Sequence, residues 1–192
     1  MTVDLIHRAV RSRTAATVPT APGLKWASVA LVVRPNADLL LIRRAEREGD
    51  PWSGHMAFPG GRQEDRDPDL AATAARETHE EVGLDLADAT LLGRLDDTLS
   101  PSRAAPSRLA ISAFVFATPH AAPPLSPNYE VADTHWLGIE RFVAHEGRGT
   151  MPFSWGGNDI TLPAVYLEDT HIWGLTLRIL DDLTSRMRSL AG

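Results

Sequence analysis

The chain has 192 residues, of which 43% are hydrophobic and 23% charged, and this composition is that of one ordinary globular domain. Its formal net charge of −6 disfavours a broad nucleic-acid surface or an anionic membrane as a partner, and the absence of cysteine excludes disulfides and thiol chemistry. No apolar run approaches the length of a membrane span and no secretory signal opens the chain, so we expect a soluble, cytoplasmic protein.

The first part of the chain predicts one helix and three strands. Residues 1–23 comprise a helix over 3–10, indicated by helical spacing of apolar residues, and a polar connector with prolines. Short apolar runs then predict strands over 27–33, 39–42 and 56–58. Pro35 and Asn36 form a turn between the first two strands, and a charged loop over 46–55 precedes the third.

A second helix is predicted to end at Gly83. Asp67 followed by Pro68 is a helix start signal, because Asp can accept hydrogen bonds from the first free N–H groups and Pro is tolerated at the first helical position. Glycine is the residue that most often follows the end of a helix. We therefore expect Asp67 to cap this helix.

Three glutamates share one face of this helix. At about 3.6 residues per turn, Glu77, Glu80 and Glu81 fall within an arc of roughly 100°. The residues expected to face the core, on the opposite side, are Ala71, Ala75 and Val82. Carboxylates about 6 Å apart repel by about 3 kcal/mol at an effective dielectric constant near 20. An enclosed acidic face therefore needs a counter-charge, whereas an open one is only a solvated surface.

A turn before the helix changes the balance between these alternatives. Residues 57–61 read AFPGG, and the double glycine allows the backbone to turn sharply and to bring a carbonyl group near the acidic face. Carboxylate and carbonyl oxygens are the ligands that hard cations such as Mg²⁺ and Mn²⁺ take. The turn and the helix together therefore predict a metal site.

The rest of the chain predicts more strands and a terminal helix. Strands are expected over 91–95, 109–117, 136–137 and 164–167. A loop over 100–107 and a Pro-rich connector over 118–128 separate them, and a helical turn is expected over 139–145. Apolar spacing predicts an amphipathic helix over 172–190. Helices before, between and after the strands indicate an α/β/α sandwich over residues 1–192.

Residues 76–84, RETHEEVGL, resemble the second half of the Nudix hydrolase signature: Arg-Glu, an aliphatic residue, any residue, Glu-Glu, any residue, Gly and an aliphatic residue. Thr78 departs from the signature at the aliphatic position. Counted from Gly61, the first glutamate of the signature is Asp67 in this chain, and eight residues instead of seven separate it from Arg76. This departure favours a capping role over a catalytic role for Asp67.

The same insertion resembles the coenzyme A pyrophosphatase branch of the family. Similar to that branch are residues 58–61, FPGG, then Thr73 and Ala74, and residues 172–176, IWGLT, whereas 50–57 keep only a Gly and a His of its usual run. The resemblance implies a Nudix-type α/β/α sandwich with a mixed β-sheet. It also implies cleavage of coenzyme A or its derivatives to 4′-phosphopantetheine and adenosine 3′,5′-bisphosphate.

Roles for the acidic helix follow from the resemblance, which implies a hydrolase dependent on Mg²⁺ or Mn²⁺. Glu77 and Glu81, one turn apart, are the principal metal ligands that it implies, and the carbonyl oxygen of Gly60 is an additional one. Glu80 is either a further ligand or the residue that orients the attacking water. Arg76 corresponds to the arginine that orients the glutamates; otherwise it forms a surface ion pair.

Residues outside the helix are weaker candidates. Glu130 is a ligand or a water-orienting base, or equally a loop carboxylate facing solvent. Arg43 and Arg44 follow a strand, so only one of them is expected to face the site and bind phosphate, and a surface role is the alternative. His55 contacts substrate or carries a proton, unless it is a packed loop histidine. The tryptophans that could stack on adenine, or else belong to the core, are Trp52, Trp155 and Trp173; of these, Trp173 is expected to pack the terminal helix.

Other functions stay open at this point. The enzyme alternatives are hydrolysis of nucleoside triphosphates, ADP-ribose or nucleotide sugars. A different class is a non-catalytic Nudix domain that senses nucleotides, which the intact set of Glu77, Glu80 and Glu81 disfavours. The expected partner is a small nucleotide or coenzyme A type molecule, and a homodimer is compatible with the resemblance.

Overall fold

The computed structural model describes residues 1–49, 52–100, 108–155 and 157–191. The helices are α1 (Val3–Arg11), α2 (Leu70–Val82), α3 (Ile139–Val143) and α4 (Gly174–Ala191). The strands are β1 (Leu24–Val33), β2 (Asp38–Arg44), β3 (Met56–Ala57), β4 (Gly60–Arg62), β5 (Thr90–Arg94), β6 (Thr98–Leu99), β7 (Arg108–Ala117), β8 (Val131–Gly138), β9 (Arg148–Trp155), β10 (Asn158–Tyr166) and β11 (His171–Trp173).

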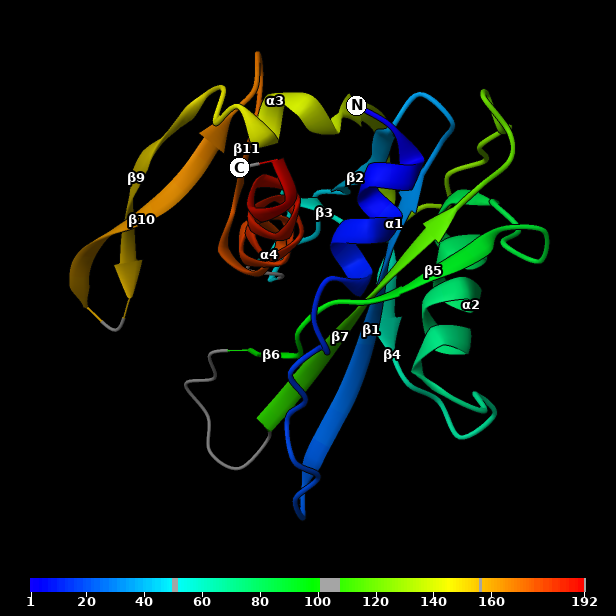
Figure 1. The fold of residues 1–192 in the computed structure, drawn as a ribbon. Coiled ribbons are helices and arrows are strands. Elements are labelled where there is room, and N and C mark those ends of the chain that lie inside the picture. The colour runs from blue at the N-terminus through cyan, green and yellow to red at the C-terminus, as the bar shows by residue number, and fades with distance from the viewer. Residues whose placement is uncertain (50–51, 101–107, 156, 192) are drawn as a thin grey trace.

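Eight of these strands form one mixed sheet. Its main order is β3-β2-β1-β7-β5, while β4 pairs with β1, β6 with β7 and β8 with β2. Strands β1 and β7 run parallel along their whole length, and the other neighbours are antiparallel. Helix α2 covers one face of the sheet, and α1 and α4 cover the other (Figure 1). The predicted α/β/α sandwich with a mixed sheet is therefore confirmed.

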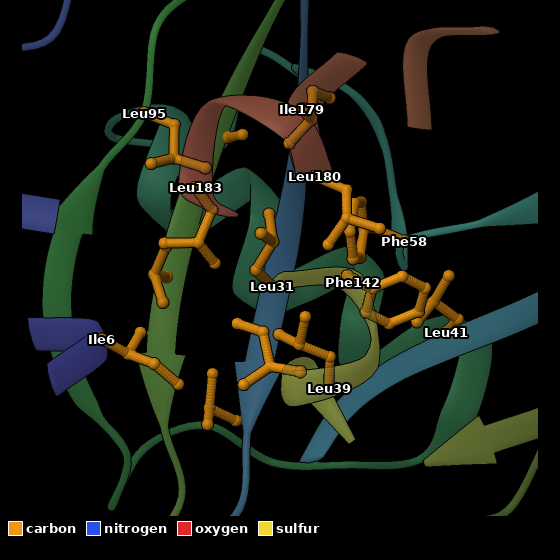
Figure 2. Close-up of a cluster of buried hydrophobic side chains, with 14 of the residues drawn as sticks. Ile6, Leu31, Leu39, Leu41, Phe58, Leu95, Phe142, Ile179, Leu180 and Leu183 are labelled. Carbon is orange, nitrogen blue, oxygen red and sulfur yellow. The ribbon is translucent and has the colours of Figure 1, made fainter. Parts of the chain in front are cut away.

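Each face of the sheet carries its own hydrophobic core, because neighbouring residues of a strand point to opposite faces. The cluster beneath α1 and α4 includes Ile6, Leu31, Leu39, Leu180 and Leu183 (Figure 2). The cluster beneath α2 includes Ala30, Val32, Leu40, Ala74 and Val82. Consecutive residues of β1 alternate between the two, and this alternation holds helices against both faces of one sheet.

Strand β1 changes partner along its length, and this change creates the place for the double-glycine turn. Toward the end of β1, Val33 pairs with Leu39 of β2. Earlier in β1, the pairing is with β4, as far as Val29 opposite Gly60. Between these two regions, the Ala30 N–H donates a hydrogen bond to the Pro59 carbonyl at 2.8 Å. The turn before β4 therefore enters the sheet and lies beneath α2.

Helix α2 begins later than predicted. Asp69 is its N-cap, and the Asp69 side chain accepts a hydrogen bond from the Ala72 N–H at 2.8 Å. The prediction that Asp67 caps the helix is wrong, because the chain needs two more residues to reach the first turn. The end of the helix is as predicted: Gly83 adopts a left-handed conformation, with φ of 68°, that favours glycine.

The last third of the chain differs most from the prediction. Strands β9, β10 and β11 form a second, three-stranded sheet, and the β9 and β10 hairpin extends away from α4 (Figure 1). Only residues 164–167 of this hairpin were predicted as strand, because Pro152 and Pro163 interrupt the strand pattern and cannot donate to a ladder. The predicted helix over 172–190 is wrong at its start, since residues 171–173 form β11 and α4 begins at Gly174.

Most of the other predicted elements are present, with shifted ends. The strand predicted over 136–137 is the end of the longer β8, and the strands β4 and β6 were not predicted. Of the predicted loop over 100–107, residues 101–107 lie outside the described residues, as do 50–51 in the loop before β3. Across the described chain, each helix is too short or too polar to span a membrane.

Replacing Leu183 by Ala tests the core beneath α4. Leu183 is fully buried, so Leu183→Ala is expected to lower the free energy of unfolding by about 2–5 kcal/mol. The matched control is Leu190→Ala on the same helix, where the side chain is 42% exposed, and its effect is expected to stay within about 0.5 kcal/mol. Urea denaturation of the three proteins measures both effects; equal losses would contradict the described packing of α4.

Candidate functional site

The double glycine allows the turn, β1 and α2 to approach one another closely. A Cβ atom on Gly60 would lie 2.3 Å from the Ser28 carbonyl oxygen, and Gly60 has a φ of 158°. A Cβ atom on Gly61 would lie 2.4 Å from the carboxylate carbon of Glu77. At Gly60 the obstructing atoms are backbone, so there is no room for a side chain, whereas a side chain at position 61 would displace the Glu77 carboxylate. The carboxylate of Glu77 consequently lies directly against the backbone of β4.

Glu81 lies deeper than the sequence pattern indicated. Its side chain is only 4% exposed, and one carboxylate oxygen, Oε2, accepts a hydrogen bond from the Gly60 N–H at 2.9 Å. Burial raises the pKa of Glu81 from its ordinary value of 4.5 to about 7; the Gly60 hydrogen bond opposes this shift, and the charge of Glu77 adds to it. The expectation that all three glutamates avoid the core face is therefore wrong for Glu81.

Glu77 is in a similar electrostatic situation. Its burial raises the pKa of its carboxyl group, and the hydrogen bond from Arg76 lowers it again. Two desolvated carboxylates one helical turn apart are costly to keep ionised together, and a nearby cation removes that cost. The chemistry of Glu77, Glu81 and the adjoining β4 backbone therefore fits a divalent ion with a preference for oxygen ligands.

Arg76 is held from the side opposite to the glutamates by Asp67. The Arg76 guanidinium donates two hydrogen bonds to Asp67, at 2.9 and 3.0 Å. The same group donates to Glu77 at 2.9 Å and to Glu80 at 3.0 Å. Asp67 is itself buried, and it also accepts hydrogen bonds from the Thr73 hydroxyl and from a backbone N–H. Asp67 therefore anchors the arginine that contacts two of the three acids.

Glu80 faces outward. Its side chain is 44% exposed, and its carboxylate pairs with Arg66 and with Arg76, each at 3.0 Å. Within the described ranges, no three His, Asp or Glu side chains gather closely enough to hold a metal ion. Glu77 and Glu81 lie against the β4 backbone and are more buried, whereas Glu80 forms ion pairs with two arginines at the surface.

A loop before β8 brings Glu130 to the acidic cluster. The Asn128 N–H donates to the Glu81 carbonyl at 2.8 Å, and the Asn128 side chain donates to the Glu80 carbonyl at 2.9 Å. These bonds dock the loop on the last turn of α2. The negative charge of Glu130 contributes to the raised pKa of Glu81, and its carboxylate also lies 3.6 Å from Arg47. Glu130 therefore belongs to the electrostatic surroundings of Glu81.

A cavity of about 390 Å³ opens beside these groups, and its lining includes Glu81, Gly60 and Gly61. Arg44 also lines it, and the positive charge of Arg44 lowers the pKa of Glu81. Arg43 does not line the cavity; its guanidinium lies 3.8 Å from Asp169. Only one of the two arginines thus faces the site, as the alternation of side chains along a strand leads one to expect.

Part of the cavity wall is aromatic. Trp52, His55 and Trp173 line it, and the ring of Trp173 lies 4.9 Å from that of His55 and 4.8 Å from that of Phe153. The prediction that Trp173 packs the terminal helix is incomplete, because β11 directs this side chain toward the cavity. Phe153 was missed because its strand was missed. The Trp155 side chain lies outside what is described.

Comparison with known proteins gives a family match and several relatives. The NUDIX domain family model matches residues 24–152. An uncharacterized protein of Schizosaccharomyces pombe is 41% identical over 56% of this chain, and this chain spans 34% of its length. Mitochondrial coenzyme A diphosphatase NUDT8 of mouse is 29% identical over 94% of this chain and 85% of that protein. Human NUDT8 is 32% identical over 78% of this chain and 62% of that protein.

Solved structures share the fold. A MutT protein from Methanosarcina mazei superimposes with a TM-score of 0.55 and 18% identity, covering 90% of this chain and 99% of that one. A MutT/nudix family protein from Enterococcus faecalis gives a TM-score of 0.55 and 17% identity, covering 95% of this chain and 73% of that one. These similarities support the arrangement of layers described above.

The pH dependence of stability tests the burial of Glu81. Its folded-state pKa is raised above the ordinary value, so the folded protein binds the proton more tightly and loses stability as the pH rises from about 4.5 through 7. In metal-free solution, Glu81→Gln is expected to match the wild type at pH 4.5 and to be more stable by about 3 kcal/mol at pH 8.5. Urea unfolding in EDTA measures this; parallel pH curves for the two proteins would contradict it.

Replacing Asp67 tests its role as the anchor of Arg76. The Arg76 guanidinium holds the pKa of Asp67 well below its usual range, so the stabilisation is complete at neutral pH and is lost as the pH falls below about 4. Asp67→Asn is expected to lower the free energy of unfolding by about 2 kcal/mol at pH 7. Asp65→Asn, at an exposed position, is the control. A loss no larger than that of the control would refute the anchoring role.

Proposed function

We propose that this chain, which belongs to the NUDIX domain family and is a Nudix hydrolase, cleaves the diphosphate of coenzyme A or its derivatives. The products would be 4′-phosphopantetheine and adenosine 3′,5′-bisphosphate. The observation that carries the proposal is the pair of desolvated carboxylates, Glu77 and Glu81, against a glycine turn that lines a cavity together with Glu81. The names of the mouse and human relatives, coenzyme A diphosphatases, support the choice of substrate.

A diphosphate resists hydrolysis because its negative oxygens repel an incoming nucleophile. Mg²⁺ or Mn²⁺ bound at the acidic helix would neutralise that charge and favour ionisation of the attacking water. In our proposal Glu77 and Glu81 are the principal ligands, and the Gly60 carbonyl is an additional one. The turn beside β1 fixes the backbone against which both carboxylates lie, so these groups are oriented before substrate arrives.

Arg76 keeps the glutamates in place. It contacts Glu77 and Glu80 on one side and Asp67 on the other, so the guanidinium cannot move away from the helix without breaking four hydrogen bonds to these acids and a fifth to the Arg62 carbonyl. In the proposed mechanism Arg76 positions these acids and does not touch the substrate. Its place between Asp67 and the acids also limits repulsion between their charges.

A carboxylate on or near the helix is assigned to accept the proton of the attacking water. Glu130 and Glu80 are the candidates: Glu130 influences Glu81 electrostatically, and Glu80 lies on the exposed side of the helix. Either one would accept a proton as the water attacks phosphorus. Arg44 lines the cavity beside Glu81, and we assign it to a phosphate oxygen; His55 lines the same cavity and is assigned to the substrate. Arg43 is not assigned to the phosphates, because it does not line the cavity and its guanidinium lies 3.8 Å from Asp169.

A substrate panel tests the proposal. Wild-type protein is incubated with coenzyme A, ADP-ribose, a dinucleotide, a nucleotide sugar and a nucleoside triphosphate, with Mg²⁺, with Mn²⁺ or with EDTA, and the products are identified by mass. We expect metal-dependent release of 4′-phosphopantetheine from coenzyme A and the highest kcat/KM on that substrate. Preferential cleavage of another member of the panel would reassign the substrate. Binding without turnover of any member would indicate a nucleotide sensor.

Glu81→Gln tests the assigned metal ligand. The variant keeps the size of the side chain but removes its charge, so kcat/KM is expected to fall by at least about 100-fold on the preferred substrate. Glu146→Gln, an exposed glutamate after α3, serves as the matched control and is expected to keep wild-type activity. Undiminished turnover in Glu81→Gln, at saturating Mg²⁺, would remove Glu81 from the mechanism.

A further inference from the structure

A second cavity, of about 560 Å³, lies along one face of α4, and most of its lining residues are charged. Of its described lining residues, only Ile179 also lines the cavity beside Glu81. We call this second space the charged cavity. Its charged lining residues come from α4, from β9 and from the segment between β5 and β6: Arg178, Asp181, Asp182 and Arg188, then Arg148, then Asp96 and Asp97. It is therefore a space separate from the proposed hydrolase site.

Both α4 acids in the charged cavity already have arginine partners. The Asp181 carboxylate accepts two hydrogen bonds from Arg148, each at 2.7 Å. The Asp182 carboxylate accepts a hydrogen bond from Arg13, in the connector before β1, at 2.7 Å. It also accepts two hydrogen bonds from Arg186, both at 2.9 Å. The negative charges of these two side chains are therefore compensated by guanidinium groups.

The two acids between β5 and β6 are compensated in the same way. Asp96 accepts two hydrogen bonds from Arg13, at 2.8 and 2.7 Å, and one from Arg186 at 2.8 Å. Asp97 forms an ion pair with Arg94, and the Asp97 side chain is only 1% exposed. Because each lining carboxylate has an arginine partner, these acids repel an incoming anion much less than their number indicates.

Arg178 and Arg188 are the lining arginines without an acidic partner. Asp181 and Asp182 follow Arg178 by three and four residues, which is the spacing of helical ion pairs, but other arginines bind both. Within the described parts of the chain, no carboxylate lies within ion-pair distance of Arg178 or Arg188. The Nη1 atom of Arg188 is shielded from water and lacks a hydrogen-bond acceptor. A bound anion would supply that acceptor.

The spacing of these arginines favours an extended anion. Arg178 and Arg188 are ten residues apart on one helix, so their Cα atoms are separated by about 15 Å. Arg148 is held at Asp181, between them along the helix. A single phosphate is too small to contact both ends of this row, whereas a chain of phosphates presents negative oxygens at several points. The planar guanidinium group suits phosphate oxygens, which it can bind through two hydrogen bonds.

We propose that the charged cavity binds an oligophosphate, a chain of three or more phosphate groups, through Arg178 and Arg188, with Arg148 as a contact between them. The chain is either free or part of a nucleotide. Positive charge at this site comes from the arginines, so binding requires no divalent ion. The proposal is independent of the proposed diphosphate hydrolysis, because Glu81 and the glycine turn do not line the charged cavity.

Isothermal titration calorimetry with inorganic orthophosphate, diphosphate and triphosphate tests the proposal. The titrations are made in EDTA at low ionic strength, so that no metal recruits phosphate to the acidic helix and salt does not screen the arginines. We expect triphosphate to bind at least about tenfold more tightly than orthophosphate, because it forms more charge-assisted hydrogen bonds. Equal affinities for the three anions, or no binding of triphosphate, would overturn the proposal.

Two variants remove the unpaired arginines, and a third serves as the matched control. Arg178→Gln and Arg188→Gln are each expected to weaken triphosphate binding by at least about tenfold. Arg178→Lys keeps the charge and is expected to weaken binding less than Arg178→Gln. Arg11→Gln removes an exposed arginine of α1 and is expected to bind triphosphate like the wild type. Thermal unfolding checks that each variant is folded. Wild-type affinity in both Gln variants of the cavity would overturn the proposal.

Arg44→Gln distinguishes the charged cavity from the cavity beside Glu81, which Arg44 lines. This variant is expected to bind triphosphate like the wild type. Loss of binding in Arg44→Gln, with binding retained in Arg178→Gln and Arg188→Gln, would place the anion at the first cavity and overturn the proposal. Titration of Arg44→Gln with adenosine triphosphate separates the two sources of the phosphate chain: affinity equal to that of triphosphate supports a nucleotide, and weaker affinity supports a free oligophosphate.

Discussion

The carboxylates of Glu77 and Glu81 are largely shielded from water against the β4 backbone, and the rest of the site depends on this arrangement. Glu81 accepts a hydrogen bond from the Gly60 N–H and is nearly fully buried, and the Glu77 carboxylate lies so close to Gly61 that a side chain there would displace it. Their charges repel, and burial makes ionisation of both unfavourable. The helix therefore gives up stability at neutral pH for an arrangement that a cation can complete, which is typical of functional sites.

The sheet and the loops supply the groups that make this arrangement rigid. Strand β1 pairs with β4 in its first part and with β2 at its end. The glycine turn therefore enters the sheet between these two regions, directly beneath α2. Because Asp69 caps the helix, the Asp67 side chain is available to pair with Arg76. The Arg76 Nε atom donates to Asp67, while its Nη1 atom donates to Glu77 and Glu80. The extra residue before Arg76 thus accompanies an anchoring role for Asp67.

Local signals in the sequence were sufficient for the elements that carry the acids. The glycine turn, the stop at Gly83 and the apolar run of β1 all depend on neighbouring residues, so the pattern predicted the layers of the fold and the helix of the site. The depth of Glu81 and the hairpin around Phe153 depend on contacts between distant segments. The positions of the glutamates around the helix do not predict which of them a strand will bury. Prolines interrupt the strand pattern, so β9 and much of β10 were not predicted.

Direct measurement of Mn²⁺ binding tests the central claim, that the buried carboxylate of Glu81 and the partly buried carboxylate of Glu77 hold a divalent ion. Electron paramagnetic resonance reports free Mn²⁺ during a titration with protein and without substrate. We expect the wild type to bind Mn²⁺ at pH 8 and Glu77→Gln and Glu81→Gln each to weaken binding by at least about tenfold, a loss of about 1.4 kcal/mol. Equal affinities in the wild type and both variants would contradict the claim.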